Sequence, residues 1–507
     1  MIVLFYVGLV ISIAALVLGI IKTRKLIKNP LENLNYKEEL KPIFYIGVAF
    51  VVAFTMLSIG LFNFVKDVKP YEYILGILGG AILAASIYLF VTSFMIHYYR
   101  KGLPAKLDKW LYIILLTSIP MMMVFFFVFL DGYAAHLIYP LANGINFEHG
   151  FVNINSTYSS NIAWYALCIL SGAVFVYFLC DHKMYVQYGK HGLLESTFLV
   201  AFPAGIIGAR IFYVIGNWTL EFQGKEWWKM FAIWEGGLTI LGGAIMGIVV
   251  GVGWFMWRNK GYNIFVAVDI IVPTILLAQA IGRWGNFFNC EVHGQLVNEA
   301  YFAWLPTVIF ENIKYSGAAG MAPSGYVYVP LFLIEGIMNV AGYFLIAELF
   351  GRKLRKYTEL GDLAFGYIIW YGLVRACLEP LRYGDYNMGE DGFWSWIWSV
   401  CFIAIGMFLI AANHIVRHII DVHRGVQSKI RDRLDYIITM VIFLGIAAAT
   451  LFPGIILMSQ SYIPQTLTFN HFMIGLILVI VSIGFVCLST IPLTYWLYSK
   501  KEGSQVA

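Results

Sequence analysis

Apolar residues run along this chain in long blocks that polar segments interrupt at fairly regular intervals. Each block is close to the roughly 20 residues that a helix needs to cross a bilayer. None shows the short alternating segments of a membrane β-barrel. The pattern therefore predicts an all-α polytopic membrane protein. We expect about 13 transmembrane helices, near residues 3–21, 43–65, 73–98, 110–130, 162–181, 195–217, 236–256, 264–283, 327–350, 361–381, 392–413, 436–458 and 470–498.

Ionisable residues are distributed unevenly among these spans. The first four spans and the last two contain almost none, whereas spans five to eleven hold the buried candidates. The first block lacks a small-residue cleavage pattern, so we expect it to be retained as a span. The unevenness predicts an N-terminal four-span extension at 1–140, an extracytoplasmic connection at 141–160, a seven-span core at 161–425 and a two-span tail at 426–507.

Composition supports this class of protein. The chain is 60% hydrophobic and 12% charged, whereas an ordinary soluble domain is about 25% charged. Its six cysteines form no CxxC pair and mostly lie in apolar blocks, which argues against a disulfide framework or a zinc site. We expect no metal, no cofactor and no nucleic-acid partner.

The positions of the basic residues predict an orientation. The loops after the odd-numbered spans, together with the C-terminus, contain 25 of the 34 Lys and Arg residues. Cytoplasmic loops of membrane proteins carry such an excess of positive charge. The N-terminus is therefore expected outside and the C-terminus in the cytoplasm.

The nine remaining basic residues differ by type. Five are lysines in outer loops, and four are arginines near the outer ends of spans: Arg210, Arg283, Arg375 and Arg382. A single arginine there can simply extend to the lipid headgroups. Four on one side favour another function, because the planar guanidinium group binds phosphate through two hydrogen bonds. We expect a phosphate-binding site that faces the outer leaflet.

The stretch "GRWGNFFNCEVHGQ" (282–295) gathers polar residues where the eighth span ends. It places Arg283, Asn286, Glu291 and His293 close together along the chain. Interfacial anchoring explains its aromatic residues but not this density of hydrogen-bonding groups.

The stretch "YGLVRACLEPLR" (371–382) puts three ionisable residues on one helical face. Arg375 and Glu379 are four residues apart, and Arg382 follows three residues later. A salt bridge within the helix accounts for one of the two arginines. The other arginine is then available for a ligand. Elsewhere, a ladder of glycines is typical of close helix packing: Gly243, Gly247 and Gly251.

These motifs resemble the prolipoprotein diacylglyceryl transferases of bacterial cytoplasmic membranes. "GRWGNFFNCEVHG" matches the family signature at every fixed position, and "AWYAL" (163–167), "GARIFYVI", "WEGGLTILGG" and "YGLVRACLEPLR" occur in the family's order. The resemblance covers about 160–420. It does not cover the first 140 residues or the last two spans.

The resemblance implies an enzyme with two substrates. It would move the sn-1,2-diacylglyceryl group of phosphatidylglycerol onto the lipobox cysteine thiol of a prolipoprotein signal peptide, at the outer face of the cytoplasmic membrane, and release glycerol phosphate. Arg283 and Arg375 match two essential arginines that would grip the phosphate. Asn286, Glu291 and Gly294 match signature positions for the headgroup. The other expected substrate-binding or supporting residues are Tyr165, Arg210, Asp269, Glu379 and Arg382.

One position departs from the family pattern. Many members have a histidine, proposed as the base for the thiol, and others a tyrosine where this chain has Leu241, which can act as neither. The thiol then ionises through the positive site itself, since adjacent arginines lower the usual thiol pKa of about 8.5, or through another base. His293 is our candidate for an auxiliary catalytic base. The alternative is a surface histidine with no role.

Three other functions remain open at this point. A transporter or flippase suits the four plain N-terminal spans, but it should place ionisable residues near mid-membrane on broken helices. Here only Asp269 lies inward. A phospholipid-headgroup transferase with another acceptor shares the phosphate grip. An inactive family member is the third alternative, and the intact signature argues against it.

Overall fold

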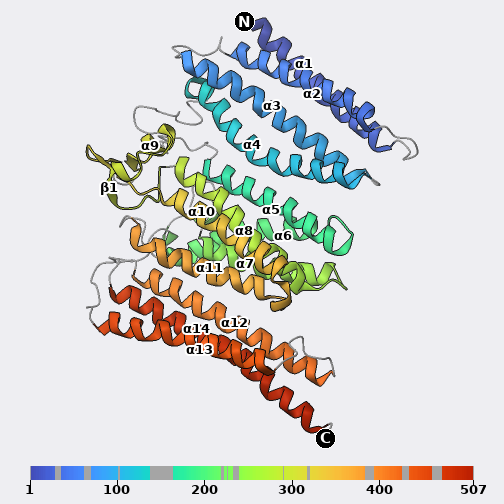
Figure 1. The fold of residues 1–507 in the computed structure, drawn as a ribbon. Helices are drawn as coiled ribbons and strands as arrows, with labels where there is room; N and C mark the ends of the chain where they lie inside the picture. Colours follow the sequence, from blue (N-terminus) through green and yellow to red (C-terminus); the bar gives the residue numbers. More distant parts are fainter. Residues whose placement is uncertain are drawn as a thin grey trace. The chain divides into compact units, whose positions relative to one another are not determined.

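A computed structural model describes most of the chain (Figure 1). The described chain divides into two compact units. The first unit comprises Met1–Lys260, Trp284–Cys290 and Pro306–Asn312, and the second Gly261–Arg283, Glu291–Leu305 and Ile313–Ala507. The described residues are 2–28, 36–61, 70–100, 103–137, 164–218, 222–224, 226–231, 239–288, 290–316, 320–382, 393–424, 433–459 and 471–505.

Helices account for nearly all regular structure in the first unit. Its elements are α1 (Ile2–Lys28), α2 (Tyr36–Leu61), α3 (Pro70–Tyr99), α4 (Ala105–Leu137), α5 (Trp164–Tyr188), α6 (Glu195–Gly216), η3 (Trp227–Phe231), α7 (Ile240–Arg258) and the short α9 (Thr307–Asn312). Helix α8 (Ile264–Phe288) contributes its last residues here and the others to the second unit.

The second unit combines long helices with two small antiparallel strand pairs, β1–β4 and β2–β3. Leu296 of β1 lies opposite Tyr328 of β4. Its elements are β1 (Leu296–Asn298), η5 (Glu299–Tyr301), β2 (Tyr315–Ser316), β3 (Gly320–Met321), β4 (Tyr326–Tyr328), α10 (Leu331–Tyr343), η6 (Phe344–Lys353), η7 (Arg355–Tyr357), α11 (Asp362–Leu378), η8 (Glu379–Leu381), α12 (Phe393–His423), α13 (Arg433–Ser459) and α14 (His471–Gln505).

The predicted fold class is confirmed, because eleven helices of the described residues are long and apolar enough to cross a membrane. The other two predicted spans, near 236–256 and 361–381, coincide with α7 and α11, which have 19 and 17 residues. Helix α11 is continued by η8 as far as Leu381. The four-part division of the chain stays a prediction, and its connection at 141–160 lies outside the described residues.

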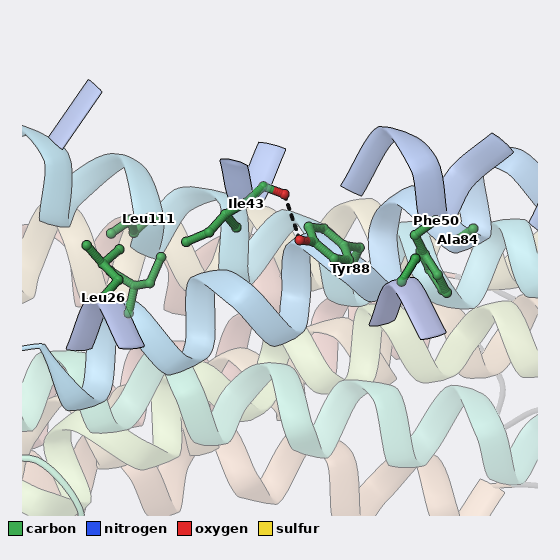
Figure 2. Packing of buried hydrophobic residues seen from close by; sticks show 8 residues of the cluster. Leu26, Ile43, Phe50, Ala84, Tyr88 and Leu111 are labelled. Atoms are coloured by element: carbon green, nitrogen blue, oxygen red, sulfur yellow. Dashed lines mark hydrogen bonds between the residues drawn. The ribbon is translucent and has the colours of Figure 1, made fainter. Parts of the chain in front are cut away.

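Helices α1 to α4 share one apolar core (Figure 2). Tyr88 of α3 lies at its centre, and its hydroxyl donates to the carbonyl of Ile43 over 2.7 Å. A Cβ added at Gly19 of α1 or at Gly47 of α2 would come within 2.6 Å of the Tyr88 ring. The two glycines therefore let α1 and α2 approach the ring closely.

Small residues also join α6 to α7, as the glycine ladder predicts. Gly243 approaches the carbonyl of Gly205, and Gly251 approaches Ala201; an added Cβ at either glycine would lie 3.2 Å from its neighbour. Such spacing brings two helical backbones into direct contact. Packing is thus a sufficient explanation for this ladder.

Candidate active site

Three arginines and two glutamates form one chain of ion pairs in the second unit, which we call the arginine network. Arg283 Nη2 of α8 lies 2.6 Å from Glu335 Oε1 of α10. Arg382 lies between the two carboxylates, 3.9 Å from Glu335 and 3.5 Å from Glu379. Arg375 Nη2 of α11 lies 2.9 Å from Glu379 Oε2. Positive and negative side chains therefore alternate along this series of ion pairs.

The arginine network is deeply buried, and its charges do not cancel. The side chains of Glu379 and Glu335 are 1% and 6% exposed, and those of Arg382, Arg375 and Arg283 are 8%, 15% and 20% exposed. Three guanidinium groups against two carboxylates leave a formal charge of +1. Among these five side chains positive groups outnumber negative ones, and guanidinium groups bind anions through charge-assisted hydrogen bonds. The network is thus suited to hold an anion, nearest its more exposed ends at Arg283 and Arg375.

Arg382 lies just beyond η8 and contacts both glutamates. Burial, and next the nearby charge of Arg375, lower the pKa of Arg382 to about 10. Its side chain therefore still carries its charge at neutral pH.

Gly294 and Gln295 join the signature stretch to Val329 and to the end of η8. The N–H of Gly294 donates to the carbonyl of Val329 over 2.9 Å, and the N–H of Gln295 donates to the carbonyl of Leu381 over 3.0 Å. A Cβ at Gly294 would lie 2.7 Å from the Val329 side chain and 2.8 Å from the Leu381 carbonyl. Only glycine permits this approach, which ties the signature to the residue before Arg382.

The signature backbone is strained on both sides of Glu291. Cys290 and Val292 have φ values of 50° and 57°, in the left-handed region that is unusual for side-chain-bearing residues and least favourable for β-branched valine. Such strain persists where the surrounding structure imposes it, often at functional sites. The half-buried Glu291 is therefore held in a fixed local geometry.

Contacts within the first unit hold the turn that follows α8. Asn312 of α9 donates to the carbonyl of Phe287 over 3.2 Å and to Cys290 Sγ over 3.4 Å. Asn286 is 4% exposed and follows Arg283 by three residues, so both lie on the same face of α8.

His293 is buried, which rules out the surface alternative. It is 0% exposed, and its ring centroid lies 5.9 Å from that of Tyr328 in β4. Its role as a base stays a prediction.

Arg210 supports the backbone of the first unit. Its Nε donates to the carbonyl of Met230 over 3.0 Å and its Nη2 to that of Lys229 over 2.7 Å. The guanidinium carbon also lies 5.5 Å from the Phe222 ring centroid. These contacts fasten η3 to α6, which explains why the arginine is buried. Its role in substrate binding stays a prediction.

Two sequence positions of interest have side chains outside the described residues. Tyr165 falls in the first turn of α5, and Leu241 falls in the first turn of α7. The predicted roles of both remain predictions. Within the part of the chain that the structure describes, no group of three or more His, Cys, Asp or Glu residues could hold a metal ion.

Sequence reasoning missed Glu335, although the arginine network passes through it. The residue lies alone in the apolar run "PLFLIEGIMN" of α10 and is 4% exposed. A lone carboxylate inside a membrane span is a functional candidate that should have a named partner. That signal was present in the sequence, and the partners are Arg283 and Arg382.

Comparisons with known proteins agree with these motifs. Residues 153–412 match the family model described as prolipoprotein diacylglyceryl transferase. A phosphatidylglycerol–prolipoprotein diacylglyceryl transferase of Malacoplasma penetrans is 33% identical over 281 residues, 51% of this chain and 76% of the relative. The same-named proteins of Clostridium novyi and Streptococcus suis are 34% and 35% identical, over 50% and 44% of this chain and 92% and 77% of the relatives.

Proposed function

This chain belongs to the prolipoprotein diacylglyceryl transferase family, and from that membership we infer that it transfers a diacylglyceryl group from phosphatidylglycerol to prolipoproteins. Its apolar helices make it a multi-pass membrane protein, and its bacterial relatives indicate the inner membrane. The observation that carries the proposal is the arginine network, since its three closely spaced guanidinium groups suit an anionic phosphodiester.

The proposed reaction joins a thiol to the glyceryl carbon that carries the phosphate. The sulfur of the lipobox cysteine in the signal peptide attacks this carbon, a C–S bond forms, and the C–O bond to the phosphate breaks. The electron pair leaves with the oxygen of glycerol phosphate, and the thiol proton passes to the departing phosphate or to water. Arg283 and Arg375 stabilise the charge that builds on the leaving phosphate.

Ionisation of the thiol follows from the same positive charge. Leu241 occupies the position where many relatives have a histidine, so a base from that position is absent in this chain. Guanidinium groups beside a thiol favour its thiolate form. We assign His293 an auxiliary role only, because its burial against Tyr328 requires the peptide to reach a covered ring.

The orientation completes the proposal. With the basic loops in the cytoplasm, the N-terminus lies outside and the ends of α8 and α11 that carry the arginine network face the outer leaflet. Asn286, Glu291 and Gly294 would border the headgroup there. This side is where a secreted prolipoprotein presents its signal peptide.

The test uses purified protein in vesicles that contain labelled phosphatidylglycerol and a lipobox peptide. We expect label on the peptide and release of glycerol phosphate, and neither with phosphatidylcholine nor with a peptide whose cysteine is replaced by serine. Glycerol phosphate without labelled peptide would show that the acceptor is another molecule. Lipid movement between leaflets without any lipid turnover would indicate transport and overturn the proposal.

A His293→Ala variant tests the auxiliary base separately. We expect a decrease in kcat of about tenfold or less, since the arginines remain, while general-base catalysis at full strength contributes about 100-fold or more. Unchanged kcat across the pH range would exclude His293 from proton transfer.

A further inference from the structure

Helix α11 carries Arg375 of the arginine network near its C-terminal end, and η8, which continues it, carries Glu379. The opposite end of α11 is fixed by side chains from other helices. The carboxylate of Asp269 in α8 accepts backbone N–H groups of Gly361, Leu363 and Ala364 at 2.9, 3.2 and 3.4 Å. It thereby satisfies donors that a helix start leaves unpaired and places negative charge at the positive end of the helix dipole.

A second carboxylate at this end binds α11 to α12. Asp362 accepts from Asn413 Nδ2 over 2.8 Å, and its other oxygen lies 2.6 Å from His414 Nε2. Because a carboxylate only accepts, His414 Nε2 carries the hydrogen of this bond. His414 Nδ1 then faces the hydroxyl of Tyr495, at 3.3 Å.

Tyr495 belongs to α14, in the C-terminal tail that the family model does not reach. Its ring also lies edge-on to His418 of α12, with the centroids 4.1 Å apart. The hydrogen-bond chain Tyr495–His414–Asp362 thus runs from the tail through α12 to the first turn of α11.

The C-terminal end of α11 needs an outside donor. Proline has no N–H, so Pro380 cannot donate to the carbonyl of Ala376 four residues before it. Trp396 Nε1 of α12 donates to that carbonyl over 3.0 Å. Ala376 is the residue directly after Arg375, and Glu379 directly precedes Pro380.

The tail reaches this end as well. Trp396 and Ala376 are 0% exposed and belong to one apolar cluster. The residues of α14 that pack against this cluster are Leu476, Ile477 and Ile480. Helix α14 therefore supports both fastenings of α11, a polar one at the first turn and an apolar one beside Arg375.

We propose that α14 is a positioning brace that holds α11, by way of α12, so that Arg375 and Arg382 are in place for the phosphate of the lipid. The proposal rests on the proposed function. It assigns the tail a role in substrate positioning and makes Trp396, His414 and Tyr495 positioning residues. Displacement of a binding group by about 1 Å can lower a rate by about 100-fold.

The test compares variants that each remove one polar group. Trp396→Phe keeps an apolar ring in the cluster and removes only the donor to Ala376, and Trp398→Phe, two residues further along α12 and 61% exposed, is its control. Tyr495→Phe removes only the hydroxyl that faces His414. Its control is Ser482→Ala, which also removes one hydroxyl from α14. The Ser482 hydroxyl donates to the carbonyl of Ala447 in α13 and not to α12.

We expect kcat/KM for phosphatidylglycerol to fall about tenfold in Trp396→Phe and about threefold in Tyr495→Phe. The fall should come mainly from a higher KM for the lipid, with KM for the peptide unchanged. Both control variants should keep wild-type values. A purely structural role would lower Tm and the yield of folded protein, while leaving KM for the lipid unchanged.

A binding measurement separates this proposal from the proposed function. The increase in Tm that vesicles of phosphatidylglycerol produce over vesicles of phosphatidylcholine reports anion binding without any transfer. If the wild type binds the anionic lipid but transfers nothing, the proposed function fails and the brace is still tested by weaker binding in Trp396→Phe. Unchanged lipid KM and unchanged binding in both Trp396→Phe and Tyr495→Phe would overturn the brace.

Discussion

Two buried polar clusters in this chain differ in how their charges are balanced. The arginine network of the second unit has three cationic and two anionic side chains. The other cluster lies in the first unit, where α3, α4 and α5 meet, and we call it the histidine junction. There His97 Nδ1 lies 2.6 Å from Asp108, and His191 Nδ1 lies 2.8 Å from Asp181.

Rings and backbone groups complete the histidine junction. Tyr112 stacks on His182 with the centroids 3.8 Å apart, and Tyr185 stacks on His191 at 3.9 Å. The second oxygen of Asp181 accepts the N–H of Gly192 over 2.7 Å. His97 and His191 each face one carboxylate, so these two pairs are balanced even when both histidines are protonated. We interpret the junction as the fastening of the N-terminal extension to α5.

The comparison teaches which buried polar groups indicate a ligand. Both clusters contain ionisable residues in a mainly apolar chain, so the presence of charge does not distinguish them. The arginine network contains three permanently charged guanidinium groups and its end arginines are partly exposed, whereas the junction contains two Asp–His pairs and stacked rings. The predictions below test this distinction in order of decreasing effect on transfer.

The largest effect is expected from loss of an arginine at an end of the network. Arg283→Ala and Arg375→Ala should each lower kcat/KM by about 100-fold or more, the cost of removing one preorganised donor to developing charge. Each change removes the surplus charge as well. Transfer to a lipobox peptide is the measurement, and the amount and Tm of the folded protein serve as controls. Wild-type transfer by either variant would contradict the assignment.

A smaller loss is expected from Glu335→Gln. The amide keeps the size of the side chain but raises the formal charge of the network from +1 to +2 and weakens the contacts to Arg283 and Arg382. Truncating one partner of a buried charge pair costs about 2–5 kcal/mol. We expect about a 50-fold decrease in transfer, because part of this free energy is lost from the stabilisation of the transition state. Glu348→Gln is the matched control, because Glu348 pairs with the exposed Arg352 at 2.8 Å.

Gly294→Ala should lower transfer by about tenfold. The added methyl group must displace Val329 or the Leu381 carbonyl, and either shift moves the backbone beside Arg382. Gly282→Ala is a suitable control within the signature, since no atom lies within 4 Å of a Cβ built there. The measurement is kcat/KM for the lipid. Equal losses in the two variants would show that flexibility of the signature, not the approach at Gly294, limits the reaction.

Much of the fold was predictable from hydropathy, because each predicted span contains a helix. The relation between Arg375, Glu379 and Arg382 was predictable too, since helical spacing alone puts them on one face. The network itself was not, because it needs α8, α10 and α11 side by side. Glu335 shows this best: its solitary charge was visible in the sequence, but its partners come from two other helices.

The surroundings of single residues were the hardest features to predict. The signature identifies Gly294, but the close approach of Val329 and Leu381 explains it. The sequence leaves open whether His293 lies at the surface, and the structure buries it near Tyr328 of β4. Pro380 has no N–H for the Ala376 carbonyl, but the sequence does not identify Trp396 as the donor that replaces it. Each depends on contacts between segments far apart in the sequence.

The smallest effect on transfer is expected in the histidine junction. Asp181→Asn removes the negative charge that faces His191 and replaces one acceptor oxygen of the carboxylate by an amide NH₂ group. Asp181 is 0% exposed, and breaking a buried pair typically costs about 3–5 kcal/mol. We therefore expect a clear decrease in Tm while kcat/KM per folded molecule stays within about twofold of the wild type, because no member of the arginine network changes. His191→Gln, which keeps a donor for Asp181, should recover part of the Tm difference seen in His191→Ala. A large loss of transfer at unchanged Tm would mean that balanced charge does not distinguish a fastening from a functional site in this chain.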